Sequence, residues 1–208
     1  MAHLLNYRYV DTGAMYRALT LYALREGLIE NRQLKEAQLI EALPTLHLDF
    51  RFNPEKNTSD VYLNDENIEM QIREMDVAKW VSQVAAVSEV RKFLVKQQQA
   101  LAADKQVVMD GRDIGTVVLP KAELEVFVAA RDPVRVQRRY DELKAKGREV
   151  TRQEVEANLE QRDFIDTTRS DSPLKLAEDA RYLDNSDITP EQQLAIVHRW
   201  VKEILHKH

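Results

Sequence analysis

The sequence predicts an α/β fold, a parallel sheet flanked by helices with a small antiparallel three-stranded insertion. Short apolar runs of strand character alternate with helical segments, which is the pattern of parallel strands joined by helical crossovers. Between residues 46 and 70 the apolar period changes to strict alternation, as in half-buried antiparallel strands. The chain has 208 residues and no cysteine, so we expect one core with an inserted lobe and no disulfides.

The first elements are a strand and two helices. YRYV at 7–10 predicts a short strand. The helix after Gly13 runs to about Gly27, because apolar residues recur at helical spacing and a glycine follows charged residues as a C-terminal stop. A second helix is predicted over about 31–43, ending before a proline.

The insertion reads as an antiparallel meander. Apolar and polar residues alternate at 46–51 and again at 60–63. Turn-forming residues at 53–57 and 64–67 separate and follow these runs, which indicates hairpin connections.

The remaining chain alternates helices with buried strands. The predicted helices are 68–74, 76–103, Asp132 to Gly147, Glu149 to Asp163, and Thr189 to Leu205; the predicted strands are 106–110, 123–129 and 181–183. Capping boxes at Thr151/Glu154 and Thr189/Gln192 mark the starts of the last two helices.

Composition and charge exclude several classes of function. The net charge of −5 argues against a nucleic-acid partner. There is no run of about 18 apolar residues, and the first residues lack the pattern of a secretion signal, so we expect no membrane span and a cytoplasmic location. The five histidines show no ligand spacing, so no protein metal ligand is assigned.

Polar clusters follow two of the predicted parallel strands. Asp11-Thr12-Gly13 follows the first, and Asp110-Gly111-Arg112-Asp113 follows the strand at 106–110. Ligands of open parallel sheets bind beyond the carboxyl ends of the strands, so these clusters are candidate site residues. A purely structural Arg–Asp clamp remains the alternative.

Three motifs in order, YVDTGAMYRA, VMDGRDIGTVV and QRDFIDTTRSDSPL, together with the insertion, resemble the bacterial cytidylate kinases over essentially the whole chain. The resemblance implies a P-loop-kinase-like fold with a helical lid at about 143–162. It implies a core formed by 1–37 and 104–208, and an acceptor-nucleotide lobe at 38–103. These kinases belong to the nucleoside monophosphate kinases, and the resemblance suggests a monomer.

The resemblance also implies the reaction and its residues. ATP is the donor, CMP or dCMP the acceptor, and Mg²⁺ the cofactor. Arg112, Arg162 and Arg169 are implied as the arginines that act on the phosphates. The implied acceptor-binding residues are Thr12 at the ribose, Arg17 and Arg112 at the phosphate, Ser82, Arg91 and Asp113 at the base, and Asp166 at the ribose. Arg138 is implied near the donor adenine.

The chemistry of these side chains agrees with such roles, because guanidinium groups suit phosphate oxygens and a carboxylate accepts from the cytosine amine. Plainer interpretations stay open for three residues. Ser82 fits an ordinary helix face, Arg91 fits a surface ion pair, and Arg138 fits a solvated helix surface.

The sequence contains no G-x-x-x-x-G-K-[ST] loop, which such kinases use to cradle the donor phosphates. Two explanations are open: the sequence given begins downstream of that loop, or the donor site has been lost. We favour the first. The alternative functions are a nucleotide-binding remnant without a donor site and a kinase of another small acceptor.

Overall fold

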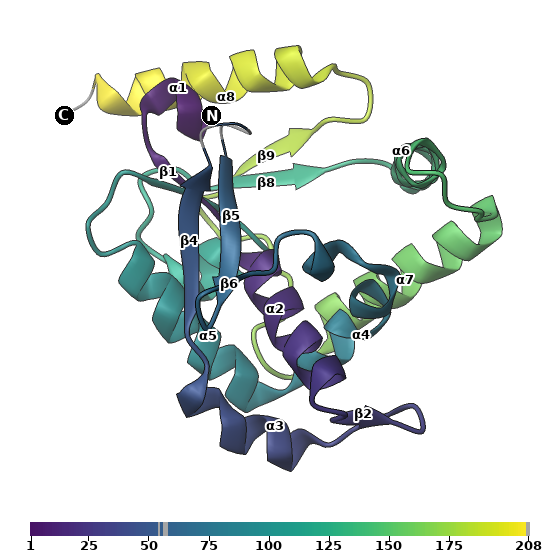
Figure 1. Ribbon diagram of the computed structural model, residues 1–208. Helices are drawn as coiled ribbons and strands as arrows, with labels where there is room; N and C mark the ends of the chain where they lie inside the picture. The colour runs from purple at the N-terminus through teal and green to yellow at the C-terminus, as the bar shows by residue number, and fades with distance from the viewer. Residues whose placement is uncertain (54, 56–57, 207–208) are drawn as a thin grey trace.

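The computed structural model describes residues 1–53, 55 and 58–206, and it has an α/β architecture (Figure 1). The strands are β1 (Arg8–Asp11), β2 (Ile29–Glu30), β3 (Gln33–Leu34), β4 (Leu48–Asn53), β5 (Thr58–Leu63), β6 (Glu66–Asn67), β7 (Val107–Asp110), β8 (Val126–Ala129) and β9 (Arg181–Asp184). The α-helices are α1 (Ala2–Leu5), α2 (Thr12–Arg25), α3 (Glu36–Ala42), α4 (Met75–Ala86), α5 (Ser88–Leu101), α6 (Asp132–Ala145), α7 (Arg152–Thr168) and α8 (Pro190–Leu205). Short turns of 3-10 helix, η1 (Leu43–Thr45) and η2 (Gln71–Arg73), and of π-helix, η3 (Ile114–Val118), complete the fold.

The predicted parallel strands are confirmed, and they form two pairs. β1 pairs with β7, and β8 pairs with β9, both in parallel. Within the described residues no hydrogen-bonded ladder joins one pair to the other. The register of the first pair places Asp11 directly opposite Asp110. The two polar clusters predicted from the sequence therefore meet at one edge of this sheet.

The predicted meander is also confirmed. β4 and β5 pair antiparallel from Leu48↔Leu63 to Asn53↔Thr58, and β6 adds a short third strand. The turn before β6 is shorter than the predicted 64–67. Asn64 and Asp65 form it, both with positive φ, and residues 66–67 already pair with β5. The predicted turn at 53–57 lies partly outside the described residues.

Three predicted helices differ in the structure. The helix expected over 68–74 is only the 3-10 turn η2, because Glu74 already has an extended backbone, with ψ 158°. The helix expected from residue 31 begins only at Glu36, because Asn31 and Arg32 take positive φ and close the β2–β3 hairpin before it. The helix expected over 76–103 is two helices. Val87 has an extended backbone, with φ −70° and ψ 119°, which ends α4 and lets α5 start in a new direction.

Other helix limits agree with the sequence. Gly27 has φ +64° just after α2 ends, as a C-terminal stop requires. Both predicted capping boxes are present at the starts of α7 and α8. α7 continues five residues beyond Asp163, to Thr168. None of the described helices is long and apolar enough to cross a membrane.

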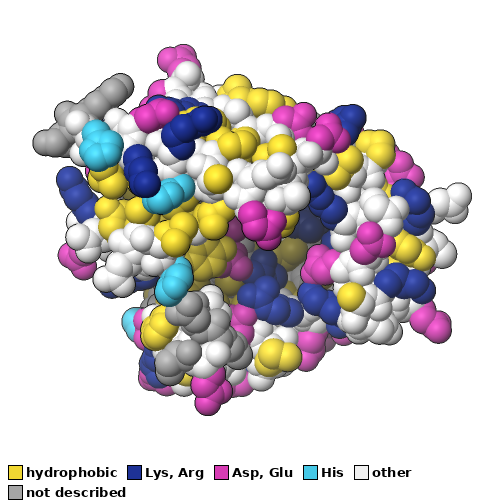
Figure 2. All heavy atoms as spheres, turned by 90° about the horizontal axis from the view of Figure 1, so that it is seen from above, with side chains coloured by type: hydrophobic (Ala, Val, Ile, Leu, Met, Phe, Trp, Pro, Cys, Tyr) yellow, Lys and Arg dark blue, Asp and Glu magenta, His cyan; other side chains and the backbone are white. Residues whose placement is uncertain are grey.

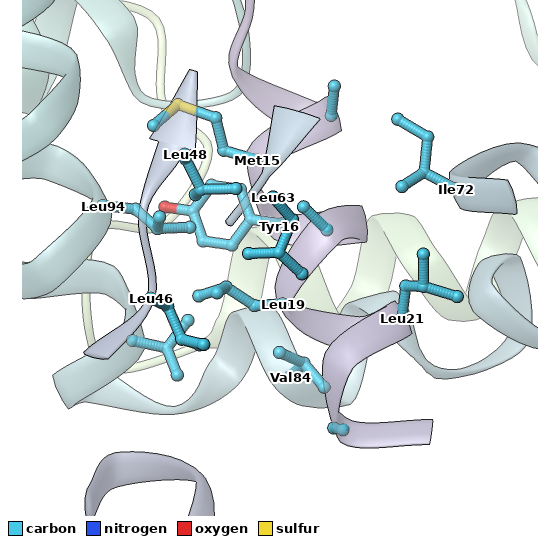
Figure 3. Packing of buried hydrophobic residues seen from close by; sticks show 14 of the residues in the cluster. Met15, Tyr16, Leu19, Leu21, Leu46, Leu48, Leu63, Ile72, Val84 and Leu94 are labelled. Atoms are coloured by element: carbon cyan, nitrogen blue, oxygen red, sulfur yellow. The ribbon is translucent and has the colours of Figure 1, made fainter. Parts of the chain in front are cut away.

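The main core surrounds α2, which packs against α4, α5 and the inner face of the β4–β5 hairpin. Figure 3 shows Met15, Leu19 and Tyr16 of α2 among Leu48 of β4 and Leu94 of α5. Met15, Leu19 and Leu94 are completely buried, and burial of one such side chain stabilises the fold by about 1.5–3 kcal/mol. This packing fixes the N-terminal end of α2, where the candidate residues lie.

Candidate functional site

The turn from β1 into α2 is organised by Asp11. Its Oδ1 accepts a hydrogen bond from the Ala14 backbone N–H at 2.9 Å, which caps the helix. Its Oδ2 accepts from Arg17 Nη2 at 2.6 Å. Thr12 is 3% exposed and donates its hydroxyl to the Asp110 carbonyl at 2.7 Å, which joins the ends of β1 and β7. Arg17 is thereby held at the edge of the sheet.

Asp110 is a carboxylate in an unfavourable setting at that edge. Burial and the nearby charge of Asp11 raise the pKa of Asp110 above its ordinary value. Burial, followed by the Asp110 charge, raises the pKa of the Tyr9 hydroxyl as well. Such mutual repulsion marks a position where added positive charge stabilises the protein.

The pair formed by Arg91 and Asp113 is buried deeply. Their side chains are 2% and 5% exposed, and Arg91 Nη2 donates to Asp113 Oδ2. The Arg91 guanidinium lies 5.5 Å from the centre of the Tyr16 ring, and Nη1 donates to the Ala85 carbonyl at 3.2 Å. The surface ion pair considered from the sequence for Arg91 is therefore wrong. A buried arginine and carboxylate of this kind can offer donors and an acceptor to a polar ligand.

A second cluster joins the motif after β7 to α7. Asp166 accepts from Arg112 Nε at 2.9 Å and from Arg169 Nη1 at 3.2 Å. The Arg169 side chain is 6% exposed, whereas the Arg112 side chain is 47% exposed. Arg169 also donates to the Ser172 carbonyl through Nε and Nη2, at 2.9 and 2.8 Å.

Arg162 adds a third positive charge to this cluster. Its Nε is buried and has no hydrogen-bond partner among the described residues. Burial and the neighbouring Arg112 charge lower the pKa of Arg162. Three guanidinium groups thus lie around the Asp166 carboxylate. The other acids that act on them, Asp163 and Asp113, are paired with Arg135 and Arg91. This excess of positive charge fits an anionic ligand, since guanidinium groups bind phosphate oxygens bidentately.

The face seen from above in Figure 2 is hollowed, and Lys and Arg side chains gather in the hollow beside Asp and Glu side chains. Gly111 explains how the loop after β7 can pass close to the start of α2. A Cβ at this position would lie 2.3 Å from Thr12 Oγ1 and 2.8 Å from Ile114 Cδ1. Only glycine allows the loop after β7 to approach α2 this closely.

Two candidates lie apart from these contacts. Ser82 is half-buried on α4, and Arg138 lies on α6. Arg138 donates to Asn185 Oδ1 at 2.8 Å and to the Asn185 carbonyl at 2.7 Å, at the end of β9. These bonds hold α6 to the turn after β9, while the Arg138 side chain stays exposed, as the interpretation of a solvated helix surface had it.

Known proteins resemble this chain along its length. The family model described as cytidylate kinase matches residues 1–203. The chain belongs to the cytidylate kinase family. A cytidylate kinase of Flavobacterium johnsoniae is 49% identical over 205 residues, covering 99% of this chain and 89% of that protein. The cytidylate kinase of Parabacteroides distasonis is 48% identical over 207 residues, covering 100% of this chain and 89% of that protein. The cytidylate kinase of Porphyromonas gingivalis is 50% identical over 196 residues, covering 94% of this chain and 85% of that protein. The resemblance inferred from the sequence motifs is confirmed.

As a cytidylate kinase family member, the chain brings most of its motif residues together. Arg112, Asp166 and Arg169 share one hydrogen-bonded cluster, although 54 residues separate Arg112 from Asp166. Nothing in the sequence indicated that Tyr16 lies beside the Arg91 guanidinium. Asp171 lies inside the third motif and hydrogen-bonds Ser88, 83 positions away, and no sequence signal pointed to that contact.

Proposed function

We propose that this family member is an ATP-dependent (d)CMP kinase that transfers the γ-phosphoryl group of ATP to CMP or dCMP, giving CDP or dCDP. Family membership over nearly the full chain supports the enzyme class and the small-molecule substrates ATP and CMP. One structural observation supports the acceptor site. The positive cluster of Arg112, Arg162 and Arg169 adjoins the buried Arg91–Asp113 pair, since the Asp113 and Arg91 charges both act on Arg169.

In this proposal the buried Arg91–Asp113 pair binds the base of the acceptor nucleotide, and arginines bind its phosphate. The Asp113 carboxylate accepts from the exocyclic amine of cytosine, and Arg91 donates to the acceptor atoms of the ring. Arg17 and Arg112 bind the CMP phosphate. Thr12 and Asp166 face the ribose, and Ser82 contacts the base from α4. Uracil has a carbonyl in place of this amine, and adenine has the amine but lacks the neighbouring carbonyl acceptor, so Asp113 and Arg91 together favour cytosine.

The arginines on α7 carry the chemistry of transfer. Phosphoryl transfer requires positioning and positive charge around the transferred group, with little covalent help from the protein. Arg162 and Arg169 supply that charge, and the lid at about 143–162 closes to exclude water from the donor. The Arg162 Nε has no hydrogen-bond partner within the described part of the chain, which fits a group that can bind a phosphate oxygen. Arg138, which now binds Asn185, lies near the donor adenine in this proposal.

The Mg²⁺ that family members of this class generally need would be bound mainly by nucleotide phosphates. Among the described residues no cluster of at least three His, Asp or Glu side chains could hold an ion by itself. The raised pKa of Asp110, caused by burial and by Asp11, fits a carboxylate placed near a cation. When bound, Mg²⁺ neutralises charge on the transferred phosphates.

A coupled assay of ADP release, run with ATP and CMP, dCMP, UMP or AMP, tests the proposal. We expect turnover with CMP and dCMP and much slower turnover with UMP and AMP. A preference for AMP would contradict the role of Asp113. Calorimetric titration with CMP alone separates the remaining alternative, because a remnant without a donor site would bind CMP and release no ADP.

A further inference from the structure

Asp171 lies inside the third sequence motif but had no role assigned from it, and its hydrogen bond links the segment after α7 to the start of α5. The Asp171 carboxylate accepts from the Ser88 hydroxyl at 2.6 Å through Oδ2 and from the Ser172 hydroxyl at 2.9 Å through Oδ1. These hydrogen bonds, the one from Ser88 foremost, lower the pKa of Asp171, so the group is charged at neutral pH. Its charge also lies at the N-terminus of a 14-residue helix, where negative charge is favourable.

The loop that holds Asp171 is fixed to the phosphate side of the site. Arg169 donates two hydrogen bonds to the Ser172 carbonyl, and the Leu174 backbone N–H donates to the Asp166 carbonyl at 2.7 Å. Ser172 has φ +50°, which turns the chain sharply at this point. Asp171 therefore moves together with Asp166 and Arg169.

Ser88, in contrast, belongs to the base side. It is the first residue of α5, and Arg91 lies three residues later, so both side chains share one face of the helix. Arg91 in turn holds the buried ion pair with Asp113. A shift of the first turn of α5 would therefore move the base-side pair relative to the arginines of α7.

We infer that Asp171 is a positioning residue for the acceptor nucleotide, because its hydrogen bond to Ser88 fixes the spacing between the Arg91–Asp113 pair and the Arg169–Asp166 pair. It touches neither the base nor the phosphate. This inference rests on the proposed CMP site. A ligand that must fill both sides at once gains affinity only when their spacing matches its own length. CMP spans both sides, whereas cytidine needs the base side alone.

Calorimetric titration of the full chain with CMP and with cytidine tests this role. Asp171→Asn removes the charge that holds the Ser88 hydroxyl, and we expect the Kd for CMP to rise about tenfold. The Kd for cytidine should change much less, by about twofold at most, because Arg91 keeps its hydrogen-bonded partner Asp113 although the Asp171 charge also acts on it. Ser88→Ala should reproduce the loss, and the double variant should be no weaker than either single variant. Ser88→Thr keeps the hydroxyl and should restore CMP affinity.

Two matched variants control for general loss of charge. Asp179→Asn removes an exposed carboxylate from the same segment, and Glu89→Gln removes one from the first turn of α5. Both should bind CMP as the wild type does. Urea unfolding of each variant shows that it is folded.

The results separate this inference from the function it rests on. No CMP binding by the wild type would overturn the proposed function and this role with it. Equal CMP affinity of wild type and Asp171→Asn, or equal losses of CMP and cytidine affinity, would overturn the role of Asp171 alone.

Discussion

Removal of Asp113 should destabilise the protein through the charge it leaves behind. In Asp113→Asn, Arg91 keeps its positive charge at a side chain that is 2% exposed, and it keeps its contacts with the Ala85 carbonyl and the Tyr16 ring. The charge of Asp171 also acts on Arg91. A buried guanidinium that has lost both water and its hydrogen-bonded carboxylate is nevertheless unfavourable.

The burial of both partners sets the magnitude. Breaking a buried ion pair from one side costs about 3–5 kcal/mol, and an amide that still accepts one hydrogen bond places this variant near 3 kcal/mol. For a chain of this length that loss lowers the melting temperature by about 6–12 °C. The double variant Arg91→Met/Asp113→Leu removes both charges, so we expect it to recover most of the stability while binding no CMP.

Urea unfolding followed by circular dichroism measures the effect as a shift in midpoint at constant slope. Asp187→Asn provides the control, because Asp187 also pairs with an arginine, Arg131, but their side chains are 77% and 60% exposed. Its midpoint should hardly move, since water screens an exposed pair.

A loss below about 1 kcal/mol in Asp113→Asn would refute the reasoning, because that is the range of exposed ion pairs. So would a double variant less stable than the single one. That result would mean that the remaining Arg91 charge is not the source of the loss.

Three further predictions concern the edge where β1 and β7 end. Arg112→Ala should lower kcat/KM for CMP by about 2–4 kcal/mol of transition-state stabilisation in the ADP-release assay, and an unchanged value would remove Arg112 from the site. Gly111→Ala should weaken CMP binding in calorimetry, because the new methyl group would displace the buried Thr12 hydroxyl; wild-type affinity would contradict the close approach. Asp110→Asn should raise the urea midpoint in metal-free buffer at pH 7 but not near pH 3.5. The Asp110 pKa is raised above 3.8 in the folded state, so the wild type loses stability as the pH rises from 3.8 through the raised value. An equal increase of the urea midpoint at both pH values would contradict this reasoning.

Local patterns in the sequence predicted the elements whose cause is local. The capping boxes of α7 and α8 and the stop at Gly27 depend on residues a few positions apart, and all are present. The alternation that predicted β4 and β5 reflects one buried face, and it too appears in the structure. The helix limits that were wrong lay where backbone geometry overrides periodicity, at Asn31, Arg32 and Val87.

The candidate site was predictable in its residues and not in its contacts. The resemblance to the cytidylate kinases implied Arg112, Asp166 and Arg169, but nothing in the sequence indicated that Asp166 would accept from both arginines. The plainer interpretation of Arg91 was wrong for the same reason. Burial of a charged side chain depends on which elements pack over it, and here α2 and the loop after β7 do so.

The sequence by itself determined the α/β class and the insertion, because these depend on short-range periodicity. Its three motifs determined the cytidylate kinase family, and the candidate residues are those that this resemblance implies. Only the tertiary structure decided which charges are paired and which are surplus. It buries Arg91 against Asp113, leaves Arg162 Nε without a partner among the described residues, and brings Asp171 to Ser88. Those outcomes depend on contacts between segments tens of residues apart, whose distance and dielectric surroundings exist only once the chain has folded.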